Sequence, residues 1–159
     1  MPNINPFEVF TYNLFELLDE TVEKVSGRYL GKGTSLFETL ATISAEEASK
    51  PVSADCGSLA AQVEHVRFYL EVTEHYMLGK EDRPWDWDNI WNTVERVTPE
   101  DWEASKNRLK ETYQRVRNLM NSFDTWDENR VGETMNILVH TAYHLGEIRQ
   151  ALCTLQVRS

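Results

Sequence analysis

Apolar residues recur every three or four positions along four long segments of this 159-residue chain, and this spacing constrains the fold more than any other feature. Because residues three and four apart share one face of a helix, each segment predicts an amphipathic helix. A shorter helix is expected over residues 35–43, and no segment shows the alternation of apolar and polar residues that is typical of a strand. The long segments run from about Pro6 to Val25, Cys56 to Leu78, Thr98 to Phe123 and Arg130 to Leu155.

Two of the predicted helices begin with capping signals. Asn5 and Thr98 have side chains that accept a backbone N–H at a helix start, and each precedes a proline, which favours the first helical position. About twenty residues separate the second segment from the third, enough for a crossover that lets those two helices run parallel. Amphipathic helices without strands bury their apolar faces against one another. We therefore expect an all-α helix bundle of four helices, formed as a single domain by residues 1–159.

Composition narrows the classes of partner and compartment. The chain has 26 acidic and 16 basic side chains and a formal net charge of −10, which disfavours nucleic acids and anionic membranes as partners, because both attract lysine and arginine. No apolar run approaches the roughly 20 residues of a membrane-spanning helix. Residues 1–6 lack the basic and apolar parts of a secretory signal, and the two cysteines form no disulfide framework. We expect a cytoplasmic protein that handles a small molecule or a protein partner.

Two of the four histidines lie one helical turn apart in the last segment. His140 and His144 are four residues apart, so they share a helix face at a spacing by which two imidazoles bind one metal ion. The same spacing also fits a solvated polar face, because His140 lies on the more polar side of the helix and His144 at the border of its apolar side. The pair therefore faces either solvent or a polar groove inside the bundle.

His65 lies in the second segment on a largely apolar strip that it shares with Tyr69. A buried imidazole needs a hydrogen-bond partner or a metal, so His65 is either a hydrogen-bonded core histidine or a ligand. The positions of His65, His140 and His144 along their helices allow all three to lie at the same height along the bundle axis. Three neutral imidazoles with one open coordination position are typical of a catalytic metal site. His75, which shares a side with two glutamates, is expected at the surface.

Several other residues invite a functional interpretation beside a structural one. Arg67 and Arg149 lie within one or two turns of the candidate ligands and can hold an anionic substrate group, or they form surface salt bridges. Cys153 lies on the apolar side of its helix and is expected to pack there. The long connection carries three tryptophans that form a lid over a pocket or cover one end of the core: Trp85, Trp87 and Trp91.

Two stretches of the sequence resemble a known family. Residues 57–65, Gly-Ser-Leu-Ala-Ala-Gln-Val-Glu-His, resemble the start of the second helix in the DinB-like (DinB/YfiT-like) superfamily. Residues 140–150, His-Thr-Ala-Tyr-His-Leu-Gly-Glu-Ile-Arg-Gln, resemble its last helix, which carries His-x-x-x-His followed by a small and a polar residue. The tryptophan-rich connection also fits, and the similarity extends over nearly the whole chain in helix order and spacing.

The resemblance implies a four-helix bundle with an up-down-down-up path and a long crossover between helices two and three. It implies a divalent metal ion, nickel or zinc, held by His65, His140 and His144. It also implies a homodimer and an enzyme that activates a low-molecular-weight thiol for transfer to an electrophile or for isomerisation. We expect a thiol transferase or a hydrolase-like enzyme, and in the transferase the electrophile would enter between the helices, near Tyr69 and the tryptophan-rich connection. Many members have no assigned reaction, so a non-catalytic metal- or ligand-binding bundle associated with stress response is the alternative.

The chain departs from the family pattern beside the histidine pair. Many relatives have arginine and glutamine at the positions that Leu145 and Glu147 occupy here. All three candidate ligands are present, whereas a contact made by that arginine or glutamine is in doubt. Glu147 either accepts the free N–H of a ligating imidazole or is solvated on the polar side of the helix. Arg149 remains a candidate for the pocket.

Overall fold

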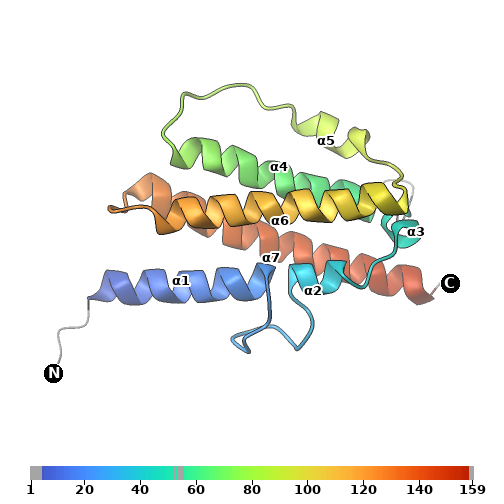
Figure 1. Cartoon of the computed structure of the whole chain (residues 1–159), viewed down its shortest axis with the longest axis horizontal. Coiled ribbons are helices and arrows are strands. Elements are labelled where there is room, and N and C mark those ends of the chain that lie inside the picture. The colour runs from blue at the N-terminus through green and yellow to red at the C-terminus, as the bar shows by residue number, and fades with distance from the viewer. Residues whose placement is uncertain (1–4, 52, 54–55, 158–159) are drawn as a thin grey trace.

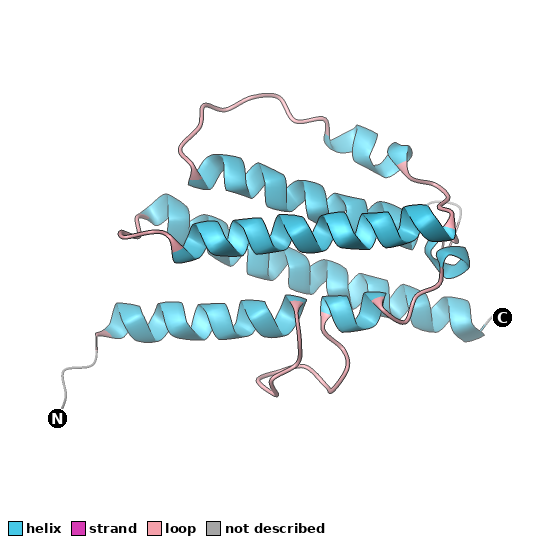
Figure 2. Cartoon of the chain, viewed as in Figure 1, coloured by secondary structure: helices cyan, strands magenta, loops and turns pink. Residues whose placement is uncertain are grey.

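The computed structural model describes residues 5–51, 53 and 56–157, and over these residues it contains seven helices and no β-strand (Figure 2). The prediction of an all-α fold is therefore confirmed. Residues 1–4, on which the expectation about a secretory signal depends, lie outside the described residues. The long helices are α1 (Pro6–Val22), α4 (Leu59–Met77), α6 (Pro99–Asn121) and α7 (Glu128–Val157), and the short ones are α2 (Leu36–Leu40), α3 (Ala45–Ala48) and α5 (Trp87–Thr93).

The four long helices lie roughly along one direction (Figure 1). Helix α4 packs against both α6 and α7, and α7 also packs against α1. Helices α1 and α7 run from left to right in Figure 1, whereas α4 and α6 run from right to left. The connection between α4 and α6 returns over α4 and contains α5, which the apolar pattern did not predict. None of the described helices has both the length and the apolar character that crossing a membrane requires.

The two predicted starts with capping residues are confirmed, and their hydrogen bonds explain them. The Asn5 side chain accepts the N–H of Phe7 (3.0 Å), and Pro6 begins α1. The Thr98 hydroxyl accepts the N–H of Asp101 (3.1 Å), which caps α6. Helices α2 and α3 each begin with a reciprocal serine–glutamate capping box, and α3 is too short for its periodicity to be visible in the sequence.

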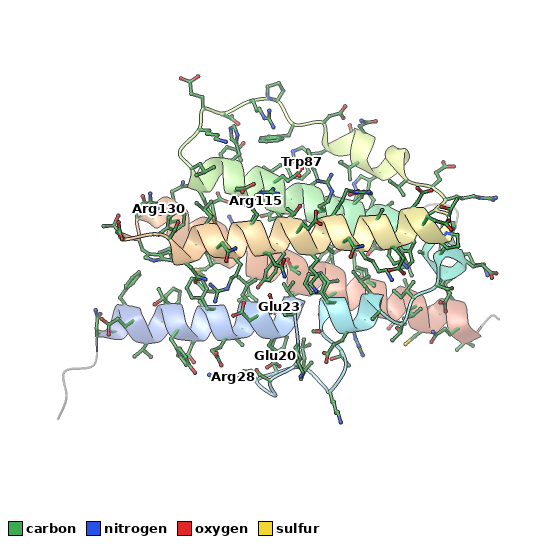
Figure 3. All side chains as sticks on the ribbon, in the orientation of Figure 1. Glu20, Glu23, Arg28, Trp87, Arg115 and Arg130 are labelled. Atoms are coloured by element: carbon green, nitrogen blue, oxygen red, sulfur yellow. The ribbon has the colours of Figure 1, made fainter. Side chains whose placement is uncertain are left out.

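Helix α1 ends at Val22, earlier than the expected Val25, and the chain then folds back toward Glu20. Glu20 is 1% exposed. Burial by itself raises the pKa of this carboxyl, but the hydrogen bonds that it accepts outweigh burial and hold its pKa well below the usual range. Figure 3 shows Glu20 and Arg28 close together at this loop. The groups that donate hydrogen bonds to the Glu20 carboxylate are the Ser26 hydroxyl and the backbone N–H groups of Ser26, Arg28, Tyr29 and Leu30.

The hydrophobic core lies where the long helices meet and extends to α2 and α3. Trp102 is buried at the start of α6, and its indole N–H donates to the backbone carbonyl of Ile43 (2.7 Å). This bond fixes the start of α6 to the segment that follows α2. Core side chains from the long helices include Leu18, Leu70, Leu109 and Ile148.

Two expectations about the apolar faces were wrong. Met135, which the three- and four-residue spacing of the last segment places among its recurring apolar residues, is 44% exposed. Because α7 packs against both α1 and α4, its buried positions include Thr134 and Thr141, which an apolar pattern does not recognise. Cys153, expected to pack on the apolar side, is exposed.

Candidate metal centre

Helices α4 and α7 bring three imidazoles together. His65 lies in the first half of α4, and His140 and His144 lie one turn apart near the middle of α7. One nitrogen of each ring lies within 4.8 Å of the others. His65 Nε2 and His140 Nε2 are 3.1 Å apart. The structure therefore brings the three predicted ligands together between α4 and α7.

A divalent metal ion fits this donor set. Imidazole nitrogens bind zinc at about 2.0–2.1 Å, so two of them in a tetrahedral site lie about 3.3 Å apart. The 3.1 Å between the Nε2 atoms of His65 and His140 is close to that value. A hydrogen bond between the two neutral rings also fits this distance, because one nitrogen can donate and the other accept. That hydrogen bond joins only His65 and His140, so it does not explain why His144 lies beside them.

The three rings are held in the neutral form, in which imidazole binds metals. Burial, together with the smaller effect of the neighbouring His144, lowers the pKa of His65 to about 4. Burial, with His144 and His65 close by, lowers the pKa of His140 to about 3. Burial also lowers the pKa of His144, against the opposing effect of Glu147. At neutral pH no proton therefore has to leave these rings before a cation binds.

Glu147 lies beside the third imidazole. Its Oε2 atom is 2.9 Å from His144 Nδ1, although the pair lacks the alignment of a hydrogen bond. His144 is 5% exposed, whereas Glu147 is partly exposed. With Nδ1 toward the carboxylate, Nε2 is the nitrogen of His144 that remains for the cluster.

Aromatic side chains surround the histidines. The Tyr69 ring is stacked on His140, with 3.6 Å between ring centroids and 7° between planes. Trp91 of α5 is stacked on His65 at 4.5 Å and 24°. Trp87, labelled in Figure 3, lies 6.1 Å from the His65 ring. Trp85, in contrast, packs against His75. Two of the three predicted lid tryptophans therefore cover the candidate centre.

The two arginines lie outside the cluster. Arg67 pairs with Glu64 (2.5 Å) and Glu71 (2.6 Å), which confirms its interpretation as a salt-bridge residue. Arg149 lines a hollow of about 110 Å³ between α7 and the α2 region, with Thr39 and Thr42. None of the three candidate ligands lines this hollow, so Arg149 does not share a cavity with them.

His75 also lies outside the cluster. It is partly buried, not fully solvated as expected, and its Nε2 atom lies 2.8 Å from the backbone carbonyl of Glu81. It lines a hollow of about 250 Å³ with Lys80, Arg83 and Arg115. Arg115 is held there by Glu74 (2.8 Å).

The stacking of Tyr69 and Trp91 on two of the histidines was not predicted. Tyr69 lies four residues after His65 on the same helix face, which indicates nearness to that ring but not contact with His140 on another helix. Trp91 reaches His65 only because the connection folds back over α4. No local sequence signal identifies either contact.

Together the fold and the site define an all-α protein with three converging imidazoles that could hold a metal ion. Comparison with protein-family models, curated proteins and solved structures finds no match to this chain.

Proposed function

We propose that this chain is a metal-dependent protein of the DinB-like superfamily, in which His65, His140 and His144 bind one divalent metal ion, nickel or zinc. The observation that carries the proposal is the convergence of three imidazole nitrogens within 4.8 Å of one another. The rings are neutral because burial lowers their pKa values. The spacing of the pair on α7 and the stretches at residues 57–65 and 140–150 support the family assignment.

The proposal includes the family's architecture: a four-helix bundle with an up-down-down-up path and a long crossover between its second and third long helices. The directions of α1, α4, α6 and α7 support it. In this architecture the metal ligands come from the second and fourth long helices, which pack against each other.

The activity that we propose is transfer of a low-molecular-weight thiol to a small electrophile. Three protein ligands leave one position of a four-coordinate ion for a cosubstrate, which is typical of catalytic sites. A bound divalent ion would supply the positive charge that favours a thiolate over a thiol. The chain's own contribution is to hold three neutral ligands and, through Trp87 and Trp91, to limit the access of water to His65.

A non-catalytic metal- or ligand-binding bundle is the second candidate. The burial of the cluster favours it, because His144 is 5% exposed and Trp91 lies flat on His65. A ligand position that aromatic rings cover is harder for an electrophile to reach. Both candidate functions use the same metal site, but only the transferase converts a substrate.

Metal analysis of untagged protein, purified without chelators, tests the site. We expect about one nickel or zinc ion per chain. The ion should be lost in His65→Ala, His140→Ala and His144→Ala, because each removes one of three donors. His75→Ala is the matched control and should retain the ion, since His75 lies outside the cluster. Protein that binds neither metal, even when the ions are supplied, would rule out the proposal.

A thiol panel with a generic electrophile then separates the two candidates. Metal-dependent consumption of one thiol, abolished in His140→Ala, supports the transferase. Metal-loaded protein that is inert to every thiol supports the binding bundle.

A further inference from the structure

Within the described part of the chain, none of the three candidate ligands has an aligned hydrogen bond at its second ring nitrogen, and two of them have no carboxylate beside it either. In most such sites the second ring nitrogen donates a hydrogen bond to a carboxylate or a carbonyl, which fixes the ring plane. His65 Nδ1 and His140 Nδ1 are both buried, and neither has a hydrogen-bond partner among the described residues. Of the three rings, only His144 has a carboxylate near its Nδ1 atom.

An imidazole without that hydrogen bond can turn about its Cβ–Cγ bond, because this torsion has broad, shallow minima. A turned ring moves its nitrogen away from the shared point and presents a carbon atom there. Some other contact therefore has to fix the ring planes of His65 and His140.

For His140, that contact is Tyr69. The two rings are almost parallel, with 7° between their planes and 3.6 Å between their centroids. This close overlap covers one whole face of the imidazole, so the ring cannot turn without a clash. Helix α4 thus supplies the candidate ligand His65. One turn later it supplies Tyr69, whose ring fixes His140 of α7.

For His65, the contact is Trp91. The indole lies 4.5 Å from the imidazole centroid, with 24° between the planes. Gly57 leaves room for it, because a Cβ atom at position 57 would lie 3.1 Å from Trp91 Cε3. The rigid indole would have to shift to accommodate any larger residue at this position.

We propose that Tyr69 and Trp91 are positioning residues, which fix the ring planes of His140 and His65 by stacking and so preorganise their Nε2 atoms for a metal ion. The expected effect on metal affinity rests on the proposed metal site. The placement of the rings can be measured without a metal.

Metal affinity tests the consequence. Loss of a group that orients a ligating histidine typically weakens metal binding by about 10–100-fold. We expect Tyr69→Leu and Trp91→Leu to weaken binding within that range in a chelator competition titration, and still to bind the same number of ions at saturation. Tyr69→Phe keeps the ring and should retain the affinity of the unmodified protein, which a role for the hydroxyl would not predict.

Two further variants serve as control and second probe. Trp85→Leu removes an indole that packs against His75, away from the cluster, and should leave affinity unchanged. Gly57→Ala keeps Trp91 but requires its indole to shift slightly, and should weaken binding less than Trp91→Leu does. Unchanged affinity in Tyr69→Leu and Trp91→Leu would overturn the inference and leave the metal site intact.

Proton NMR of the metal-free protein tests the placement. The ring protons of His140 should show an upfield ring-current shift that Tyr69→Leu abolishes and Tyr69→Phe preserves. The absence of this shift from the folded, unmodified protein would contradict the stacking. If the shift is present but the protein binds no metal, the proposed function fails while the stacking stands.

Discussion

At the scale of single residues, the partners of the three histidines differ, and this difference sets how each ring is held. His144 has the Glu147 carboxylate 2.9 Å from its Nδ1 atom. His65 and His140 have aromatic rings instead. A carboxylate beside a ligating imidazole fixes its tautomer and makes its other nitrogen a stronger donor. Glu147 therefore either orients His144 as a metal ligand or is a solvated surface residue, and a substitution separates these two roles.

We predict that Glu147→Ala weakens metal binding by about 10-fold, because His144 loses the group that favours Nε2 as its donor atom. The measurement is a chelator competition titration at neutral pH. Glu128→Ala, at the exposed start of the same helix, is the matched control and should bind metal like the unmodified chain. Equal affinities in both variants would mean that Glu147 is a solvated residue.

At the scale of elements, one buried carboxylate holds residues 26–30 of the loop that follows α1. Glu20 accepts five hydrogen bonds from residues 26–30, four of them from backbone N–H groups. An unpaired buried N–H group costs free energy, so these donors and the carboxylate depend on each other. The contact determines both where α1 ends and where the loop returns.

The lowered pKa of Glu20 predicts how stability depends on pH. The folded chain binds this proton more weakly than the unfolded chain, so the stabilisation is fully present above the ordinary glutamate pKa, near 4.5. It is lost progressively as the pH falls below that value toward the lowered pKa. We expect Glu20→Gln to lower the midpoint of thermal unfolding at pH 7, with the difference from the unmodified chain shrinking below about pH 4.5.

Calorimetry or circular dichroism at several pH values makes this measurement. Glu16→Gln is a suitable control, because Glu16 forms only a partly exposed ion pair with Arg28 (3.3 Å) and surface pairs contribute little. A Glu20→Gln variant whose deficit stays constant from pH 7 to pH 3 would show that the carboxylate charge is not what stabilises the loop.

At the scale of the whole molecule, α7 carries an exposed apolar row on the side away from its buried positions. Met135, Val139 and Tyr143 recur every four residues and are 44%, 66% and 62% exposed. Contiguous apolar side chains at a surface often mark an interface. The homodimer expected from the family resemblance remains a prediction, and this row is where we place its contact.

We predict that Val139→Asp converts a dimer into a monomer, because an apolar interface does not accommodate an unpaired carboxylate. Light scattering coupled to size-exclusion chromatography reports the mass. Gln114→Asp, at an exposed position of α6 rather than α7, should not change it. A monomeric unmodified chain, or a dimer that tolerates Val139→Asp, would exclude this face as the interface.

The sequence by itself determined the four long helical segments, the capped starts of α1 and α6, and the one-turn spacing of His140 and His144. These features are local, since periodicity, capping and i to i+4 spacing depend on residues within a few positions of one another. The resemblance and the depth argument also led to His65. They left open whether its ring faces the pair or a core partner, because no local pattern states how far a helix is rotated about its axis.

The tertiary structure alone decided which faces are buried and which side chains meet. Packing of α7 against both α1 and α4 exposes Met135 and buries Thr141, against the apolar pattern. The return of the connection over α4 brings Trp91 onto His65, while Arg149 lines a hollow that none of the three histidines lines. Such contacts depend on helix rotation and on the path of a long connection, and the free energy that selects them comes from packing between segments distant in the sequence.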